Sequence, residues 1–198
     1  MAQPDRPYSV NAQVPDVDRS AVSMRWLWPT LLVAVTAVAS LAFACVTPFA
    51  AIALVAARTL RRRAAFLTIA AVWLANQAVG FAALDYPRDA ETLAWGVAIG
   101  VAAVASTMAA AALMRRFHAA SMALSLIAGF AASFVVFEAV LFATAPILGG
   151  TDTFAPAIIG ELLLLNGAWA VALIAVHEAW RRAGFSRRLS LRGAPVAR

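Results

Sequence analysis

The sequence has one cysteine, no lysine and few charged residues, and each shortage narrows the class of protein. A single cysteine, Cys45, allows no disulfide within the chain. Only 13% of the 198 residues are charged while 63% are hydrophobic, which excludes both a soluble domain and a disordered chain. The absence of lysine beside abundant alanine is typical of a bacterial genome rich in G and C. The sequence contains no phosphate-binding loop, nucleophile elbow or Cys-x-x-Cys motif, so we do not expect an enzyme.

The charges mark the ends of the apolar runs. Arginines close the runs on one side, at Arg61–Arg63, Arg115–Arg116 and Arg181–Arg182, and Asp85–Pro87 and residues 146–152 close them on the other. The net charge of +6 therefore does not indicate a nucleic-acid-binding patch. The runs are about 20–25 residues long, enough to cross a hydrocarbon core of about 30 Å. The pattern predicts an integral membrane protein whose arginine clusters lie in the cytoplasm.

We predict an all-α fold, a single membrane bundle of six transmembrane helices, with both termini in the cytoplasm. Residues 1–25 are polar and lack the layout of a signal peptide, so they are predicted to form a cytoplasmic tail. Residues 183–198 form a basic tail that we expect to rest on anionic headgroups. The bundle occupies residues 26–182. The predicted helices are 26–44, 48–60, 64–84, 91–114, 118–144 and 156–181.

The apolar stretch 26–60 is ambiguous because it is too long for one simple crossing. Pro48 lies in its middle, and proline removes a backbone donor and disfavours helical geometry in the residue before it. One interpretation is two helices, the second too short to cross fully. The alternative is one long, kinked helix, which would give five helices in all. Arg19 and Arg25 favour two helices, because both arginines then lie on the same side as Arg61.

Five amide and carboxylate side chains lie well inside the predicted helices, all between the membrane centre and the periplasmic surface, and apart from His177 near Arg181 nothing comparable lies in the cytoplasmic half. Inserting an ionisable group at this depth costs about 2.5–3.5 kcal/mol of free energy, so each such group is expected to have a structural or functional role. One interpretation is a water-accessible cavity open to the periplasm, which we favour for the two carboxylates. The other is hydrogen bonding between helices. The five residues are Asn76, Gln77, Glu138, Glu161 and Asn166.

Three further residues complete the candidate ligand site. Tyr86 and Trp95 lie near this polar layer and could line a pocket for a flat organic ligand, although ordinary packing also accounts for each. Cys45 falls at the predicted turn before Pro48, where we expect it to be reached from the periplasm. Its thiolate could ligate a metal centre, or the residue could be a small apolar filler.

Small residues recur at helical spacing, as in Gly96 with Gly100 and Ala53 with Ala57. Such pairs let helices approach closely. They indicate either a surface for a partner subunit or packing inside the bundle, and the abundance of alanine favours the latter.

The size, the six helices and the internal termini resemble the substrate-binding S-component of an energy-coupling-factor vitamin transporter. The segment Val72–Phe81, followed by Asp85-Tyr86-Pro87 and Trp95-Gly96, is similar to small proteins of the cobalamin-specific branch. The resemblance implies uptake of a small organic nutrient, with a pocket in the outer half and an ATPase module as a partner. It also implies that Cys45 could hold the cobalt of cobalamin as transported ligand, with no resident cofactor. The alternatives are a structural or assembly protein, and a small ion or metal permease with Glu138 and Glu161 as ligands.

Overall fold

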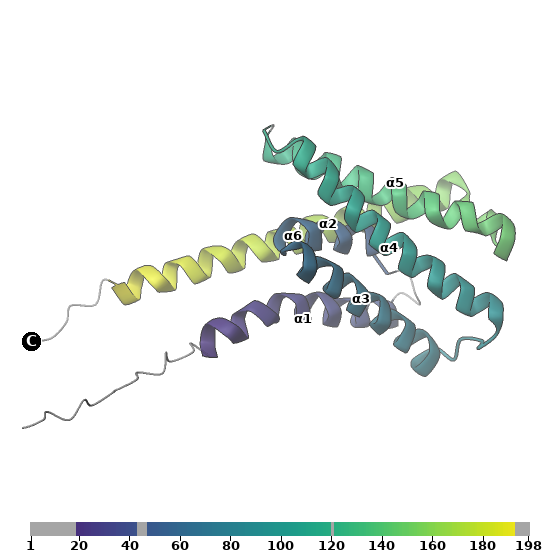
Figure 1. Ribbon diagram of the computed structural model, residues 1–198, viewed down its shortest axis with the longest axis horizontal. Coiled ribbons are helices and arrows are strands. Elements are labelled where there is room, and N and C mark those ends of the chain that lie inside the picture. The colour runs from purple at the N-terminus through teal and green to yellow at the C-terminus, as the bar shows by residue number, and fades with distance from the viewer. Residues whose placement is uncertain (1–18, 43–46, 120, 193–198) are drawn as a thin grey trace, which may run out of the picture.

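The chain folds into helices throughout, as a computed structural model describes it for residues 19–42, 47–119 and 121–192. Within these residues there are six α-helices, one short 3-10 helix and no strand (Figure 1). The prediction of an all-α membrane bundle is confirmed. The elements are α1 (Arg19–Ala42), α2 (Phe49–Thr59), α3 (Arg62–Ala83), α4 (Ala90–Arg116), α5 (Met122–Leu148), η1 (Thr151–Phe154) and α6 (Pro156–Arg192).

Four helices are long and apolar enough to cross a membrane. These are α3, α4, α5 and the part of α6 from Pro156 to Ala183. Their outer faces carry exposed large apolar side chains, such as Leu164 at 75% and Val135 at 63% exposure. A water-soluble bundle would bury such faces, whereas a lipid-facing bundle exposes them. The protein is therefore a membrane protein.

The stretch around Pro48 is broken into two helices, as the arginine pattern favours. Pro48 occupies the N-cap position of α2, and Thr47 and Pro48 are not helical. With 11 residues, α2 is about 16 Å long, roughly half the hydrocarbon core. The prediction that the second helix does not cross fully is confirmed. Cys45 lies outside the described residues.

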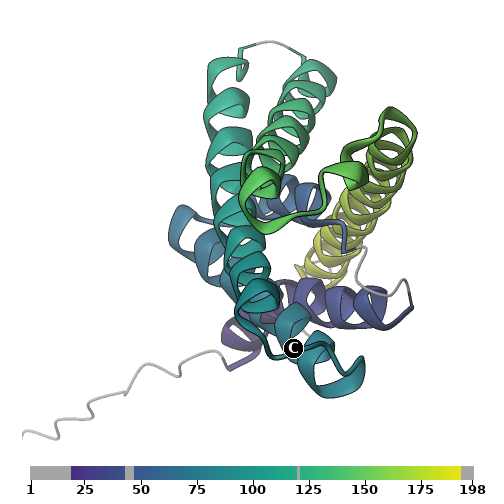
Figure 2. The ribbon, with the colours of Figure 1, turned by 90° about the vertical axis from the view of Figure 1, so that its right-hand side faces the viewer.

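The short helix α2 is the centre of the bundle. All eight residues from Phe49 to Ala56 are buried, and α2 packs against α3, α4, α5 and α6 (Figure 2). Ala53 lies among these buried residues, so the Ala53 and Ala57 pair packs inside the bundle. The indole nitrogen of Trp28 on α1 donates a hydrogen bond to Thr59 Oγ1 at 2.9 Å, which ties α1 to the end of α2.

The glycine pair of α4 permits close contact with α3. A Cβ atom at Gly100 would lie 2.9 Å from Trp73 Cε2. The Trp73 indole donates to the carbonyl of Gly96 at 2.8 Å. Gly96 and Gly100 therefore serve packing inside the bundle and not a partner surface.

Several helix ends differ from the prediction. The first helix begins at Arg19 and not at residue 26, so it includes the end of the predicted tail 1–25, and α5 begins at Met122 and not at residue 118. The prediction that the fifth helix ends before Pro146 is wrong, because α5 continues to Leu148. Proline removes one hydrogen bond, but in an apolar surrounding a broken helix would leave several backbone groups without partners. The turn comes instead at Gly149 and Gly150, whose φ angles of 85° and 84° suit glycine. The sixth helix likewise extends past the predicted end at residue 181, to Arg192.

At the start of α4, Asp89 acts as the N-cap and accepts a hydrogen bond from the Thr92 amide at 2.8 Å. This hydrogen bond lowers the pKa of the Asp89 carboxyl below its ordinary value. The predicted start at residue 91 is therefore correct to within one residue.

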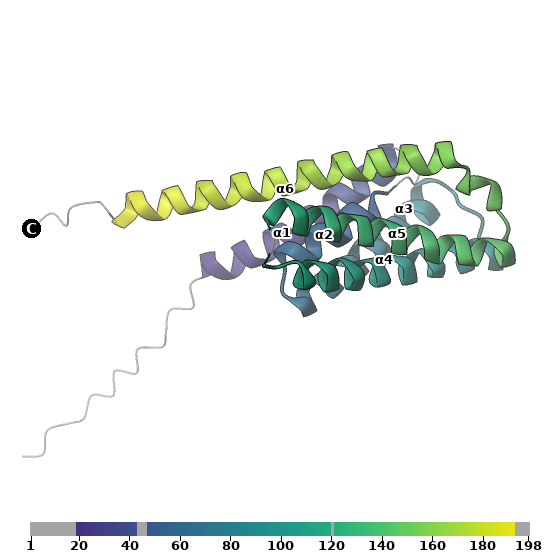
Figure 3. The ribbon, with the colours of Figure 1, turned by 90° about the horizontal axis from the view of Figure 1, so that it is seen from above.

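The bundle has two distinct ends. The Arg19 end of α1 and the Arg192 end of α6 lie on the same side (Figures 1 and 3). We call this side the arginine end, because Arg58, Arg61–Arg63 and Arg115–Arg116 also lie there. The other side, formed by residues 84–89 and 149–155, is called the opposite end.

Candidate functional site

Buried hydroxyl and amide groups meet where α2 begins. Asn76 Oδ1 accepts hydrogen bonds from Thr47 Oγ1 at 2.6 Å and from Ser40 Oγ at 2.9 Å. The two hydroxyls are 2.8 Å from each other. All three residues are buried. Asn76 on α3 thus joins the end of α1 to the start of α2.

Asn166 on α6 caps α2 from outside the helix. Its Oδ1 accepts from the Ala51 amide at 3.2 Å, and its Nδ2 donates to the Leu162 carbonyl at 2.9 Å. Pro48 at the N-cap position provides no side-chain hydrogen bond. The first amides of a helix have no partner within it, so Asn166 does for Ala51 what an N-cap side chain normally does.

Ser133 on α5 adds a third contact, because its hydroxyl donates to the Ala50 carbonyl at 2.8 Å. We call Ser40, Thr47, Asn76, Ser133 and Asn166 the capping layer. Backbone groups that are not paired within a helix are tolerated at membrane depth only when the protein satisfies them. For Asn76 and Asn166 the structure therefore favours hydrogen bonding between helices over a role in a cavity.

The capping layer lies deep in the bundle. At 1.5 Å per residue, Asn76 is about 10 Å from the end of α3 at Ala83, and Asn166 is about 15 Å from the start of α6 at Pro156. Ser133 is about 22 Å from Leu148, where α5 ends. The helices α3, α5 and α6 therefore extend beyond the start of α2 toward the opposite end.

The two carboxylates lie outside the capping layer. Glu138 is five residues beyond Ser133 and Glu161 is five residues before Asn166, so each is about 7.5 Å closer to the opposite end. Glu138 is half-buried and Glu161 is exposed. Within the described residues neither carboxylate has a hydrogen-bond or ion-pair partner. Both remain free to contact something that is not part of the bundle.

The other candidate residues do not join this arrangement. Gln77 faces Gly96 at the interface of α3 and α4. Tyr86 folds back over Gly80 and packs edge-on against Phe81, with ring centroids 6.4 Å apart. The Trp95 indole lies beside the loop, 3.8 Å from a Cβ built at Gly150. Gln77 and Tyr86 therefore pack against α3 and α4, and Trp95 packs against the loop after α5.

Sequence reasoning missed the hydroxyl members of the capping layer. A serine or threonine inside a helix usually bonds to the carbonyl four residues earlier, as Thr36 does to Leu32 at 2.8 Å. Ser133 instead bonds to another helix. The sequence does not distinguish a hydroxyl that bonds within its own helix from one that bonds to another helix, because it does not show which neighbour each face of the helix contacts.

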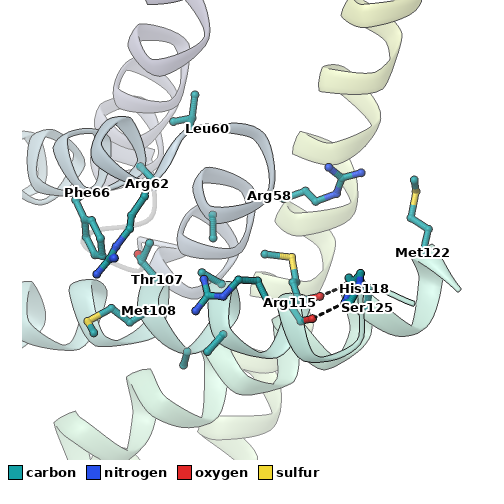
Figure 4. A pocket seen from close by; sticks show the side chains of 16 residues that line it. Arg58, Leu60, Arg62, Phe66, Thr107, Met108, Arg115, His118, Met122 and Ser125 are labelled. Carbon is teal, nitrogen blue, oxygen red and sulfur yellow. Dashed lines mark hydrogen bonds between the residues drawn. The ribbon is translucent and has the colours of Figure 1, made fainter. Parts of the chain in front are cut away.

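A groove lies at the arginine end, which the sequence did not predict. It has a volume of about 920 Å³ and opens between α3 and α4 (Figure 4). Among the residues that the structure describes, no group of three or more His, Cys, Asp or Glu side chains could hold a metal ion.

Comparison of the chain with models of protein families, with curated proteins and with solved structures finds no match.

Proposed function

We propose that the protein is a bacterial inner-membrane uptake protein that binds a small organic nutrient at the opposite end of the bundle. The candidate nutrient is a vitamin, and cobalamin is the first to test. In this proposal the protein resembles an S-component of an energy-coupling-factor transporter, acting alone or with an ATPase module. The opposite end would then face the periplasm.

The observation that carries the proposal is the unpaired carboxylate of Glu138 in an apolar helix. Placing a carboxylate at this depth costs about 2.5–3.5 kcal/mol, and nothing in the described part of the bundle offsets that cost. A contact with a polar ligand would provide the missing partner. The nearby start of α2 supports this view, because transporters commonly bind substrates where a helix is interrupted near the membrane centre.

A structural or assembly role is the second candidate, and the capping layer favours it. Asn76 and Asn166 are fully explained by holding α2 in place. A structural role does not explain why Glu138 and Glu161 are present, because neither carboxylate contributes to holding α2. A small ion permease, with these two carboxylates as ligands, is the third candidate.

Ligand retention tests the proposal. The full chain would be purified in mild detergent from cells supplied with cobalamin, then denatured, and the released molecules would be identified by mass spectrometry. We expect a corrinoid or another organic nutrient in an amount comparable to that of the protein. Stoichiometric metal without an organic molecule would favour the permease. A folded protein that retains nothing and binds no added corrinoid would contradict the proposal.

The orientation provides a separate prediction: both termini lie in the cytoplasm. The arginine clusters are expected on the cytoplasmic side, and the Arg19 and Arg192 helix ends share that side of the bundle. Alkaline phosphatase and fluorescent-protein fusions, placed before residue 19 and after residue 198, would report the side of each terminus. Fluorescence without phosphatase activity is expected at both positions. Phosphatase activity at either terminus would contradict the orientation.

A further inference from the structure

The groove at the arginine end forms because α3 and α4 diverge. The two helices are in contact at Trp73 and Gly100 and separate toward the arginine end (Figure 1). Ala57 from the end of α2 and Met114 from α4 line the space between them. The groove is open to the outside of the bundle, and α3 and α4 are both membrane-spanning. A membrane-embedded molecule could therefore enter it from the side.

The polar part of the groove is entirely basic or neutral. Arg58, Arg62, Arg115 and His118 line it, and no acidic residue does. Within the described residues none of these arginines forms an ion pair, and the recorded pair of Arg181 with Glu178 lies on α6. The guanidinium groups of Arg62 and Arg115 face the groove, whereas that of Arg58 points toward α6 (Figure 4). Two guanidinium groups beside one space attract an anion, and arginine matches the geometry of a phosphate group.

The apolar part of the groove begins beside the Arg62 guanidinium and continues deeper along α4. Phe66 is one helical turn beyond Arg62, with its ring centre 6.0 Å from the guanidinium carbon. Met108 is seven residues from Arg115, which is about 10 Å deeper along α4. Alanines of α4 line the groove as well. The groove thus combines a cationic mouth with an apolar wall (Figure 4), which suits an amphiphile with an anionic head.

We propose that this groove binds one anionic phospholipid. Its phosphate is held by Arg62 and Arg115, and one acyl chain lies along Phe66 and Met108. A soluble phosphate compound would use the arginines and leave the apolar wall exposed. Basic pockets between helices at the cytoplasmic side are suited to anionic headgroups. The site differs in place and ligand chemistry from the nutrient site, so either could fail without the other.

The experiment measures lipid binding to the delipidated full chain in detergent. Phosphatidylglycerol, phosphatidylcholine and inorganic phosphate would be titrated separately, with native mass spectrometry and the thermal unfolding midpoint as readouts. The test variant is Arg62→Gln with Arg115→Gln. The matched control is Arg63→Gln with Arg116→Gln, which removes the same charge from exposed positions that do not line the groove.

We expect phosphatidylglycerol to bind and to raise the unfolding midpoint, and phosphatidylcholine and phosphate to do so far less. The test variant should weaken phosphatidylglycerol binding about tenfold or more, since each lost charge-assisted contact acts on the phosphate directly. All four arginines are exposed, but Arg63 and Arg116 do not line the groove. The control should therefore change phosphatidylglycerol binding by less than about twofold, because charges that make no direct contact are screened.

Three results would overturn the proposal. Equal losses in both double variants would indicate diffuse attraction to the basic surface. Equal binding of phosphatidylcholine would indicate apolar filling alone, and an equal effect of inorganic phosphate would indicate a plain anion site.

If the test variant does not fold, Ala112→Phe replaces it, because Ala112 is an exposed alanine that lines the groove and all arginines are kept. Loss of phosphatidylglycerol binding in that variant supports the groove. Unchanged binding excludes it.

Discussion

Replacing Asn166 with leucine is expected to lower the free energy of unfolding of the bundle by about 1–3 kcal/mol. The substitution removes the acceptor of the Ala51 amide, which is buried and has Pro48 rather than a capping side chain before its helix. A backbone amide is fixed in direction and cannot turn to another acceptor. The substitution adds apolar volume, so the loss is caused by the missing hydrogen bond and not by a cavity.

Two matched variants show whether the effect is specific. Gln77→Leu makes the same kind of change on α3, but no hydrogen bond of Gln77 is recorded in the described part of the chain, so we expect little change. Asn76→Leu should have an intermediate effect, since the Ser40 and Thr47 hydroxyls lie 2.8 Å apart and one can rotate to donate to the other once Asn76 Oδ1 is gone. Thermal and SDS-induced unfolding of the purified proteins would measure the order. A loss in Gln77→Leu as large as that in Asn166→Leu would contradict a capping role.

Replacing Glu138 with glutamine is expected to reduce nutrient retention about tenfold or more without destabilising the protein. A hydrogen bond from a ligand to a charged carboxylate contributes about 1.5–3 kcal/mol, and each 1.4 kcal/mol is a factor of ten in affinity. The side chain is half-buried and has no partner within the described bundle. Its neutralisation should therefore leave the unfolding midpoint unchanged or raise it.

Glu178→Gln is the control for this variant. Glu178 lies at the arginine end, where it pairs with Arg181 at 3.3 Å, far from the proposed nutrient site. The Glu178→Gln variant also lacks one carboxylate of a membrane helix, and it should retain the nutrient as the original chain does. Equal retention by the Glu138 and Glu178 variants would contradict a ligand contact at Glu138. Glu161→Gln, tested in parallel, shows whether the exposed carboxylate also contributes.

The fold was largely predictable because charged residues and prolines mark the ends of membrane helices in the sequence. The alternation of arginines with acids and prolines gave the number and direction of the helices, and Pro48 marked the break before the short α2. The predicted end before Pro146 was wrong because a proline near the end of an apolar helix removes only one hydrogen bond, so α5 continues through it. The turn comes at Gly149 and Gly150, where the backbone adopts positive φ angles.

The site was less predictable. The sequence indicates how deep a residue lies in the membrane, but it does not show toward which neighbouring helix the side chain points. Asn76 and Gln77 are neighbours in the chain, yet Asn76 bonds to Thr47 while Gln77 packs against Gly96. Asn166 was placed at the right depth, but its bond to the Ala51 amide depends on how α2 sits among the other helices. The groove was missed because Arg62 and Arg115 belong to different helices and meet only through the divergence of α3 and α4.

We propose that the polar side chains inside this bundle perform two separate tasks. Those of the capping layer hold α2, and the carboxylates outside that layer contact a ligand. Stability and nutrient retention should be measured on the same preparations of Asn166→Leu and Glu138→Gln. We expect Asn166→Leu to lose stability and to retain nutrient in proportion to the amount of folded protein. We expect Glu138→Gln to keep its stability and to lose the nutrient. If both variants lose stability, and both retain nutrient in proportion to the folded fraction, the division into two tasks is contradicted.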